Sequence, residues 1–441
     1  MSTIGNSWAG YLALAGFFLA YLLVVFEEKI HLKKSKPVVL VGCLMWLFIG
    51  IYEAGHGGGE HAHEFIKELI AEIGALFFFL LVAMVYVNTL EERNVFRSLR
   101  SWLLRKGLGF RSLYWATGLI TFFLSPLADN LTSALLMSTV ALAVSNGNAK
   151  FIIPAFVNIV VAANAGGAWS PFGDITTLMV WTSGKVETLQ FVYLMIPSLV
   201  NWIIPATIMY PFIPKGKPEI SSDAIPLKPG AKTIIALGII TVATAVSFHQ
   251  FLHLPPFMGM MLGLGLLMFQ GYYLQYWSAR SPLKPLGTSK KRMEEPFDLF
   301  QNVARVEFDT LLFFFGILTA VGALQYIGYL ALISVSLYET IGPTWSNIIV
   351  GFLSAIIDNI PIMFAVLKMD PAMGVDQWLL VTLTAGVGGS LLSIGSAAGV
   401  AVMGVDRDNY TFLSHLKWAP AIALGYVASI FSWWLVTGSF R

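Results

Sequence analysis

Long apolar runs separated by short polar segments make up most of this chain. Ten runs have, or nearly have, the length of about 20 helical residues that a membrane crossing requires. They fall at 8–26, 38–52, 65–89, 113–144, 189–212, 233–250, 257–277, 306–322, 344–367 and 418–437. The second run is short, and we expect its helix to extend on either side. The pattern predicts an all-α polytopic membrane protein with ten spans.

Two further apolar stretches, 151–183 and 377–405, are interrupted by glycine-rich segments at 164–173 and 386–395. Irregular backbone at membrane depth is tolerated only where protein shields it or where it lines a cavity. We therefore expect each stretch to be a re-entrant hairpin, which enters and leaves on one face of the membrane.

Composition supports a membrane location. Of the 441 residues, 56% are hydrophobic and 12% are charged, whereas soluble domains carry roughly 25% charged residues. The single Cys43 has no partner for a disulfide. The first run lacks a preceding basic region, so we interpret it as a span and not as a cleaved signal peptide.

Lysine and arginine gather in four segments, at 29–36, 93–111, 215–232 and 280–305. The loops at 53–64, 145–150 and 323–343 carry almost none, apart from Lys150. Because basic loops stay in the cytoplasm, the four segments are predicted to be cytoplasmic and both termini to lie outside.

A short polar pattern occurs once in each half of the chain. Ser125-Pro-Leu-Ala-Asp129-Asn130 interrupts one span, and Ser354-Ala-Ile-Ile-Asp358-Asn359 interrupts another. A carboxylate inside the membrane is costly and usually functional. Five spans in each half make the second half inverted relative to the first, as in transporters built from internal repeats. We expect repeats at 1–225 and 226–441, each with a broken helix and a re-entrant hairpin, and we expect Asp129 and Asp358 to approach each other.

The polar residues at these interruptions offer carboxylate, amide and hydroxyl oxygens, which hard cations prefer. No Cys or His lies among them, which disfavours a soft transition metal, and we expect no basic residue near either tip, where an anionic substrate would need one. The predicted site for Na+, Li+ and H+ comprises Asp129, Asn130, Thr132, Asn164, Asp174, Thr176, Thr177, Ser354, Asp358, Asn359, Ser393 and Ser396.

Several of these residues have structural interpretations as well. The asparagines and glycines can satisfy buried backbone groups, and Asp174 can sit at a wet hairpin mouth. Glu72, Glu307 and Asp309 lie near span ends, where ion pairing and a proton pathway are both open. The segment 53–64, with His56, His61 and His63, is either a solvated loop or a metal or pH site.

The motifs Ser-Pro-Leu-Ala-Asp-Asn-Leu-Thr-Ser-Ala and Asn-Ala-Gly-Gly-Ala-Trp-Ser-Pro-Phe-Gly-Asp-Ile-Thr-Thr resemble those of NhaD-type sodium/proton antiporters. The resemblance covers about 65–437. It implies that the polar motif residues of the family correspond to the predicted site residues, with Glu307 and Asp309 in a preceding span. It also implies efflux of Na+ or Li+ in exchange for protons, by an elevator-like motion of the hairpin domain.

The leading hypothesis is therefore a secondary antiporter working by alternating access, and the alternative is a transporter of arsenite or a carboxylate on the same fold. A channel is weakly excluded. An intramembrane hydrolase is disfavoured because the chain lacks a His-Glu-x-x-His motif. We expect no enzyme activity and no cofactor beyond the transported ions. The expected partners are the lipids of a bacterial inner (plasma) membrane and no nucleic acid, and a homodimer is left open.

Overall fold

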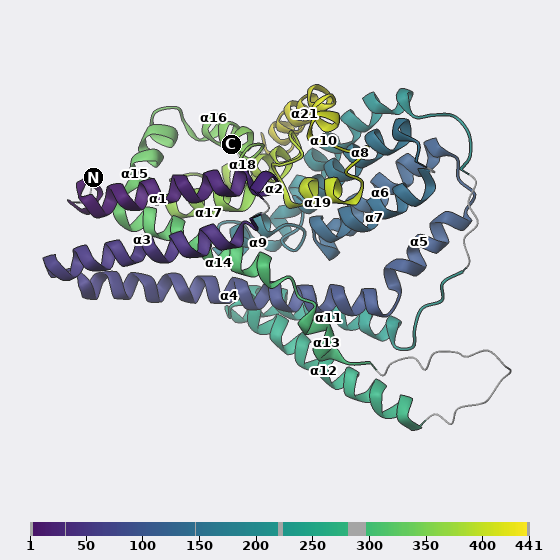
Figure 1. The fold of residues 1–441 in the computed structure, drawn as a ribbon, viewed down its shortest axis with the longest axis horizontal. Helices are drawn as coiled ribbons and strands as arrows, with labels where there is room; N and C mark the ends of the chain where they lie inside the picture. Colours follow the sequence, from purple (N-terminus) through teal and green to yellow (C-terminus); the bar gives the residue numbers. More distant parts are fainter. Residues whose placement is uncertain (1–2, 31, 146, 219–223, 281–296, 439–441) are drawn as a thin grey trace. The chain divides into compact units, whose positions relative to one another are not determined.

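The computed structural model describes residues 3–30, 32–145, 147–218, 224–280 and 297–438, and every element in these ranges is helical (Figure 1). The first part contains η1(Thr3–Asn6), α1(Trp8–Val25), α2(Glu27–Ile30), α3(Ser35–His56), α4(Gly59–Glu92), α5(Val95–Arg105), α6(Phe110–Ala128), α7(Asn130–Ser145), α8(Ala149–Gly167), α9(Ile175–Thr182), η2(Thr188–Leu194), α10(Met195–Met209) and η3(Tyr210–Phe212). The second contains α11(Ala231–Leu252), α12(Pro256–Arg280), α13(Leu299–Ala304), α14(Phe308–Ile327), α15(Tyr329–Ser334), η4(Val335–Glu339), α16(Pro343–Leu353), α17(Asn359–Met369), α18(Val375–Gly388), α19(Ala397–Val405), α20(Phe412–Leu416) and α21(Ala419–Thr437).

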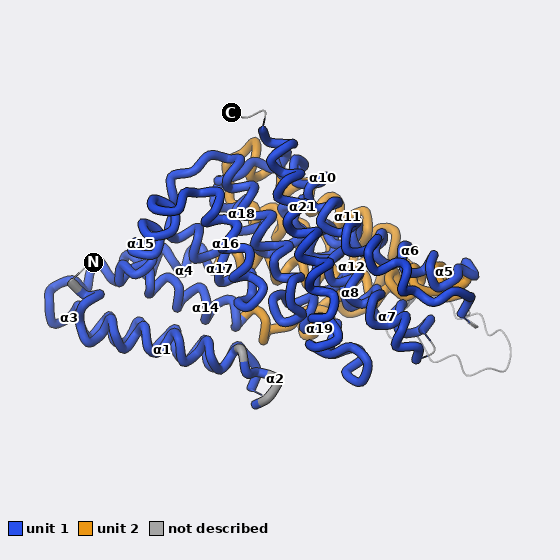
Figure 2. Tube along the Cα trace, turned by 90° about the horizontal axis from the view of Figure 1, so that it is seen from above, with its two compact units in different colours: residues 1–73, 106–221, 312–441 blue, residues 74–105, 222–311 orange. Residues whose placement is uncertain are grey.

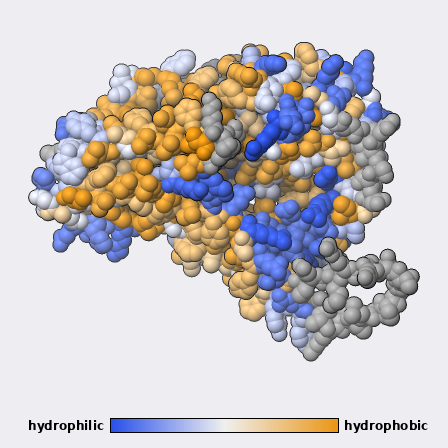
Figure 3. Space-filling view, in the orientation of Figure 1, coloured by the Kyte–Doolittle hydropathy of each residue, from blue (hydrophilic) through white to orange (hydrophobic). Residues whose placement is uncertain are grey.

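Eight helical segments of the described chain are long and apolar enough to cross a membrane. They are Ser35–His56, Gly59–Glu92, Ala149–Gly167, Thr188–Phe212, Ala231–Leu252, Pro256–Tyr276, Phe308–Ile327 and Ala419–Thr437. The second expected span does extend on both sides, to Ser35 and His56. Apolar side chains also cover most of the face that Figure 3 shows. These observations confirm the prediction of an all-α polytopic membrane protein.

The chain divides into two compact units (Figure 2). Unit 1 comprises 1–73, 106–221 and 312–441, and unit 2 comprises 74–105 and 222–311. All predicted site residues lie in unit 1. The basic residues Lys284, Lys290, Lys291 and Arg292 of the fourth predicted cytoplasmic segment lie outside the described residues.

Expectations about three segments can now be checked. The expectation of a loop at 53–64 is wrong, because α3 and α4 continue through this segment and only Gly57 and Gly58 separate the two helices. Gly57 makes this tight turn with a φ of 80°, a conformation that glycine adopts without steric cost. The helical interruptions expected at the two glycine-rich segments are confirmed, since α8 ends at Gly167 and α18 ends at Gly388.

The expectation that 113–144 forms one broken span running through the membrane is also wrong. Helices α6 and α7 pack against each other, and both pack against α8. Asp129 joins them with φ 57° and ψ 164°, a backbone conformation that is rare for a residue with a side chain. The chain therefore turns back at Asp129, and of α6, α7 and α8 only α8 is both long and apolar enough for a crossing.

The second half contains related elements in the same order. Helix α16 ends at Leu353, α17 begins at Asn359, and α16 packs against α18 as α6 packs against α8. The hydroxyl of Ser125 donates to the Ala163 carbonyl at 2.6 Å, and the hydroxyl of Ser354 donates to the Ala385 carbonyl at 2.7 Å. Helix α7 packs against α8 and α19 as α17 packs against α18 and α9, and the halves differ in that α7 also packs against α6 whereas α17 packs against α15.

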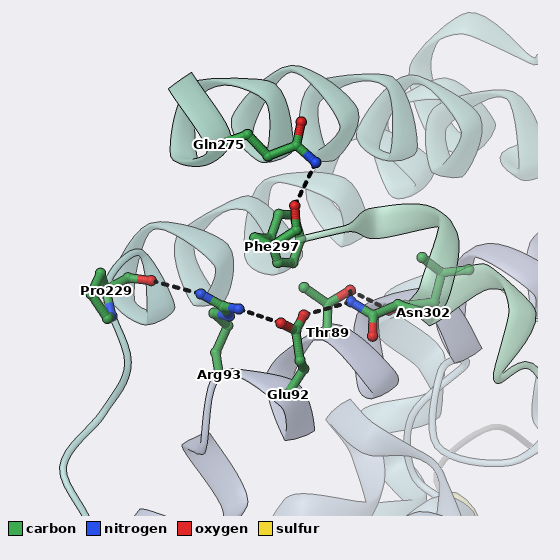
Figure 4. A network of polar contacts seen from close by, with 8 residues as sticks. Thr89, Glu92, Arg93, Pro229, Gln275, Phe297 and Asn302 are labelled. Carbon is green, nitrogen blue, oxygen red and sulfur yellow. Dashed lines mark hydrogen bonds and ion pairs between the residues drawn. The ribbon is translucent and has the colours of Figure 1, made fainter. Parts of the chain in front are cut away.

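In unit 2, α11 packs against α12, and a polar network joins the end of α4 to the segments around it (Figure 4). The buried guanidinium of Arg93 pairs with Glu92 and donates to the Pro229 carbonyl at 3.5 Å. Asn302 donates to the other carboxylate oxygen of Glu92 at 2.8 Å. These contacts compensate the charge of Arg93.

Candidate functional site

The carboxylate of Asp174 lies where side chains of the two halves of the chain meet. Its Oδ2 accepts a hydrogen bond from Asn130 at 3.0 Å and another from Asn359 at 2.9 Å. Asn130 is the first residue of α7 and Asn359 is the first residue of α17. Asp174 is only 4% exposed, so the expectation that it can sit at a wet hairpin mouth is wrong.

Local capping fixes the other side of this carboxylate. Asp174 has extended backbone and is the N-cap of α9, where its Oδ1 accepts from the Thr176 N–H at 3.2 Å. The Thr177 hydroxyl completes a capping box by accepting from the Asp174 N–H at 3.3 Å, and it also donates to the Asp174 carbonyl at 2.7 Å. Because an N-cap oxygen satisfies free N–H groups of the first turn, Oδ1 is held by the helix and Oδ2 faces the two asparagines.

Asn164, near the end of α8, extends the cluster to the second half. Its Oδ1 accepts from Asn130 at 3.2 Å, and its Nδ2 donates to the hydroxyls of Ser390 and Ser396 at 2.8 and 2.9 Å. Ser396 is the N-cap of α19 and accepts from the Gly399 N–H at 3.2 Å. We name Asn130, Asn164, Asp174, Asn359, Ser390 and Ser396 the polar cluster; all six are buried.

Helix ends around the polar cluster set its electrostatics. Helices α7, α9 and α17 each begin directly after an aspartate, namely Asp129, Asp174 and Asp358. Asp129 accepts from the Thr132 N–H at 2.7 Å and from the Thr132 hydroxyl at 3.0 Å. A helix N-terminus favours an anion, and here the protein's own carboxylates take that position. The arrangement therefore leaves these termini satisfied and disfavours an anionic ligand.

Three buried hydroxyls in the same segments have no hydrogen-bond partner among the described residues: those of Ser133, Thr176 and Ser393. Buried polar groups are normally satisfied by protein, water or a bound species. These oxygens can therefore accept a cation or a water. No group of three or more His, Cys, Asp or Glu side chains that could hold a metal occurs in the described chain.

The expectation that no basic residue lies near either tip is wrong. Lys34, which precedes α3, places its Nζ 3.2 Å from Oδ2 of Asp358. Sequence reasoning missed this contact because 324 residues separate the partners. Asp358 also accepts from the Ile360 N–H at 3.3 Å, as the N-cap of α17.

The remaining candidates lie outside the polar cluster. Ser354 uses its hydroxyl to bind the Ala385 carbonyl. Glu72 pairs with Lys368 and has a side chain that is 54% exposed. Glu307 is exposed and accepts from the Thr310 hydroxyl at 3.1 Å, and Asp309 lies with it in unit 2.

His415 was also missed by sequence reasoning, and it contacts the polar cluster through Ser390. Its Nε2 lies 2.9 Å from the Ser390 carbonyl and its Nδ1 lies 2.6 Å from the Tyr410 hydroxyl. Since a carbonyl only accepts, Nε2 carries the proton and Nδ1 accepts from Tyr410. His415 and Tyr410 are both 0% exposed. No sequence signal indicates this role, because 25 residues separate His415 from Ser390.

Comparisons with known proteins agree with the resemblance seen in the motifs. Residues 21–386 match the model of the citrate transporter family. The chain is 50% identical over 435 residues to a Na+/H+ antiporter NhaD of Vibrio cholerae, covering 96% of this chain and 91% of that protein. An NhaD antiporter of Alkalimonas amylolytica is also 50% identical, with 96% and 90% covered.

A plant protein shows that the similarity extends beyond bacteria. Sodium/proton antiporter 1 of Arabidopsis thaliana is 32% identical over 445 residues, covering 97% of this chain and 73% of that protein. The similarity thus spans both halves of the chain and every segment that contributes to the polar cluster. The chain therefore belongs to the family that the citrate transporter model describes and to the family of NhaD-type Na+/H+ antiporters.

Proposed function

We propose that this protein is a secondary antiporter that exports Na+ or Li+ in exchange for protons by alternating access. The observation that carries the proposal is the buried Asp174 carboxylate, which is shared by Asn130 of the first half and Asn359 of the second. A buried carboxylate surrounded by neutral oxygen ligands suits a small monovalent cation. The family relatives named as Na+/H+ antiporters support the same conclusion.

Na+ is the substrate, and the polar cluster is its proposed site. Asp174 supplies the charge, while the amide oxygens of Asn130, Asn164 and Asn359 and the free hydroxyls of Thr176 and Ser393 supply neutral ligands. A half-turn of an asparagine amide exchanges its N–H donors for its oxygen acceptor. We infer that the amides of Asn130 and Asn359 donate to Asp174 when Na+ is absent and turn their oxygens inward when it binds. The remaining proposed site residues, at the edge of the cluster, are Asp129, Thr132, Thr177, Ser354, Asp358 and Ser396.

Exchange follows from competition at the carboxylate. Asp174 binds either a proton or Na+, and each neutralises it. An empty, charged site is costly to move through the bilayer, so the site-bearing helices cross only when loaded. This coupling needs no separate proton channel, although Glu72, Glu307 and Asp309 remain candidates for proton delivery.

The proposed architecture is an inverted repeat, with halves at 1–225 and 226–441. The matched contacts of Ser125 and Ser354, and the matched packing of α6 and α16 against α8 and α18, support it. We revise one assignment within the first half. The contact between α6 and α7 favours these two helices as the re-entrant hairpin, and the combined length and apolar character of α8 favours α8 and α9 as the broken span.

We further propose that the protein lies in a bacterial plasma membrane with the basic segments 29–36, 93–111, 215–232 and 280–305 in the cytoplasm. The positive-inside rule supports this orientation. A homodimer is compatible with it. No cofactor is needed, because the chemistry is exchange of two ions at one site.

Transport of a carboxylate is the weaker candidate, despite the family model's name. Three helix N-termini of the polar cluster already hold aspartates, and Lys34 is paired with one of them. A di- or tricarboxylate would meet like charges there. Arsenite transport has no specific observation in its favour.

The test is dissipation of a pH gradient in everted membrane vesicles by Na+, Li+, K+ and citrate in turn. We expect Na+ or Li+ to dissipate the gradient and citrate to have no effect. Asp174→Asn should abolish the response, and Asp408→Asn, which changes an exposed loop aspartate, should retain it. Citrate uptake without any cation-dependent pH change would overturn the proposal.

A further inference from the structure

The ion pair between Lys34 and Asp358 is unusual among those of unit 1 because both partners are largely covered. The side chains of Lys34 and Asp358 are 24% and 13% exposed. In the other two ion pairs found among the described residues of unit 1, one partner is more than half exposed: Asp370 at 62% and Glu72 at 54%. Exposed pairs contribute little, whereas a covered pair holds two charges that each need the other.

The surroundings of Lys34 favour its position. Its Nζ lies 4.3 Å from the centroid of the Phe313 ring, within the range of a cation–π contact. Its backbone N–H donates to Oε1 of Glu27 at 3.2 Å, which ties the segment before α3 to α2. The backbone of Lys34 is thus fixed by a hydrogen bond, while its long, flexible side chain places the ammonium group against Asp358.

The pair adjoins the polar cluster directly. Asp358 precedes Asn359, and Asn359 donates to the Asp174 carboxylate at 2.9 Å. Asp358 also caps the helix that begins with Asn359. A change in what neutralises Asp358 is therefore transmitted through one residue to Asp174.

We propose that Lys34 is a built-in counter-ion of the cation site. It neutralises Asp358 while Na+ is absent, and Na+ gains full access to this carboxylate only when the ammonium withdraws. Lysine suits this role because its charge is compact and its stem flexible. The inference rests on the proposed function and adds that the protein itself supplies a competitor for the transported cation, which sets the Na+ affinity.

The test is Na+ binding by the purified full-length protein at one fixed pH, measured with radioactive Na+. Lys34→Met removes the competitor and should tighten the apparent Kd for Na+ on the order of tenfold, which corresponds to about 1.4 kcal/mol. Lys34→Arg should leave the Kd within about twofold. Lys36→Met is the matched control, because Lys36 is exposed in the same basic segment, and it should bind like the wild type.

An unchanged or weakened Na+ affinity in Lys34→Met would overturn the counter-ion role and leave a structural ion pair. If Lys34→Met does not fold, Lys34→Gln removes the same charge with a polar side chain. In an Asp358→Asn background, Lys34→Met should change the Kd for Na+ by less than about twofold, because Lys34 then has no carboxylate to neutralise. A tenfold tighter Kd for Na+ in this double variant would contradict the pairing. Failure of wild-type protein to bind Na+ would instead count against the proposed function.

Discussion

At the scale of single residues, several of the polar side chains that the sequence pattern singled out lie in contact with one another, among them Asn130, Asn164 and Asp174. The same pattern favours Asp129 and Asp358 as a pair, and their approach to each other stays a prediction. The contacts place Asp174 between Asn130 and Asn359. A sequence shows which positions are polar, but 185 residues separate Asp174 from Asn359, and only the packing of α9 against α17 brings them together.

The first prediction concerns these two asparagines. Asn130→Ala and Asn359→Ala each remove an amide oxygen that we assign to Na+ and a donor to Asp174. Loss of the oxygen ligand weakens the Na+-bound state, so each change should raise the apparent KM for Na+ on the order of tenfold. Vesicle exchange measures this, with Asn409→Ala, at a loop asparagine that binds Asp406, as the control. Unchanged KM values in both variants would exclude the asparagines as ligands.

The second prediction concerns His415, which we interpret as a positioning residue for Ser390. His415→Leu leaves the Tyr410 hydroxyl and the Ser390 carbonyl without their partner, at a cost of roughly 1–3 kcal/mol each. We expect a raised KM for Na+ with a smaller change in maximal rate, and rescue by His415→Gln, which restores a donor. If His415→Leu lowers thermal stability while KM stays at the wild-type value, His415 acts only on folding.

At the scale of elements, helix positions followed from the apolar runs, and the glycine-rich interruptions were found where expected. The direction of the chain after Asp129 could not be predicted. An apolar run of the length of 113–144 fits one long broken helix and two antiparallel arms equally well, and the choice depends on the packing of α6, α7 and α8. The contact between Lys34 and Asp358 could not be predicted either, because it also depends on the packing of segments that are 324 residues apart.

A prediction at this scale concerns the crossing of α16 and α18. A Cβ added to Gly388 would overlap the Gly351 carbonyl oxygen, so the two backbones touch there. Gly388→Ala should destabilise the protein by about 1–3 kcal/mol and impair exchange, read as a lowered Tm and a lowered rate. Gly404→Ala, in α19 with open space around the glycine, should change neither. Wild-type behaviour of Gly388→Ala would contradict the close approach.

At the scale of the whole molecule, composition and basic segments predicted the class of protein and its orientation in the membrane. The class is confirmed by the apolar helices and the family match. The orientation depends on the bilayer, which the packing of helices within the chain does not report, whereas the inverted repeat stays a proposal that the matched contacts of the two halves support.

Cysteine accessibility checks the orientation. In a Cys43→Ser background, which removes the single native cysteine, Lys36→Cys should react with a membrane-impermeant reagent from the cytoplasmic side. His63→Cys, near the start of α4, should react from the opposite side. Labelling of both positions from the same side would contradict the predicted topology.

The central claim is that one buried carboxylate, Asp174, binds Na+ and protons in competition. Its most direct test is Na+ titration of purified protein in weakly buffered solution, with bound Na+ and released protons measured together. We predict that wild-type protein and Asp408→Asn release protons as Na+ binds, and that Asp174→Asn neither binds Na+ nor releases protons. Undiminished Na+ binding with proton release in a folded Asp174→Asn protein would contradict the account.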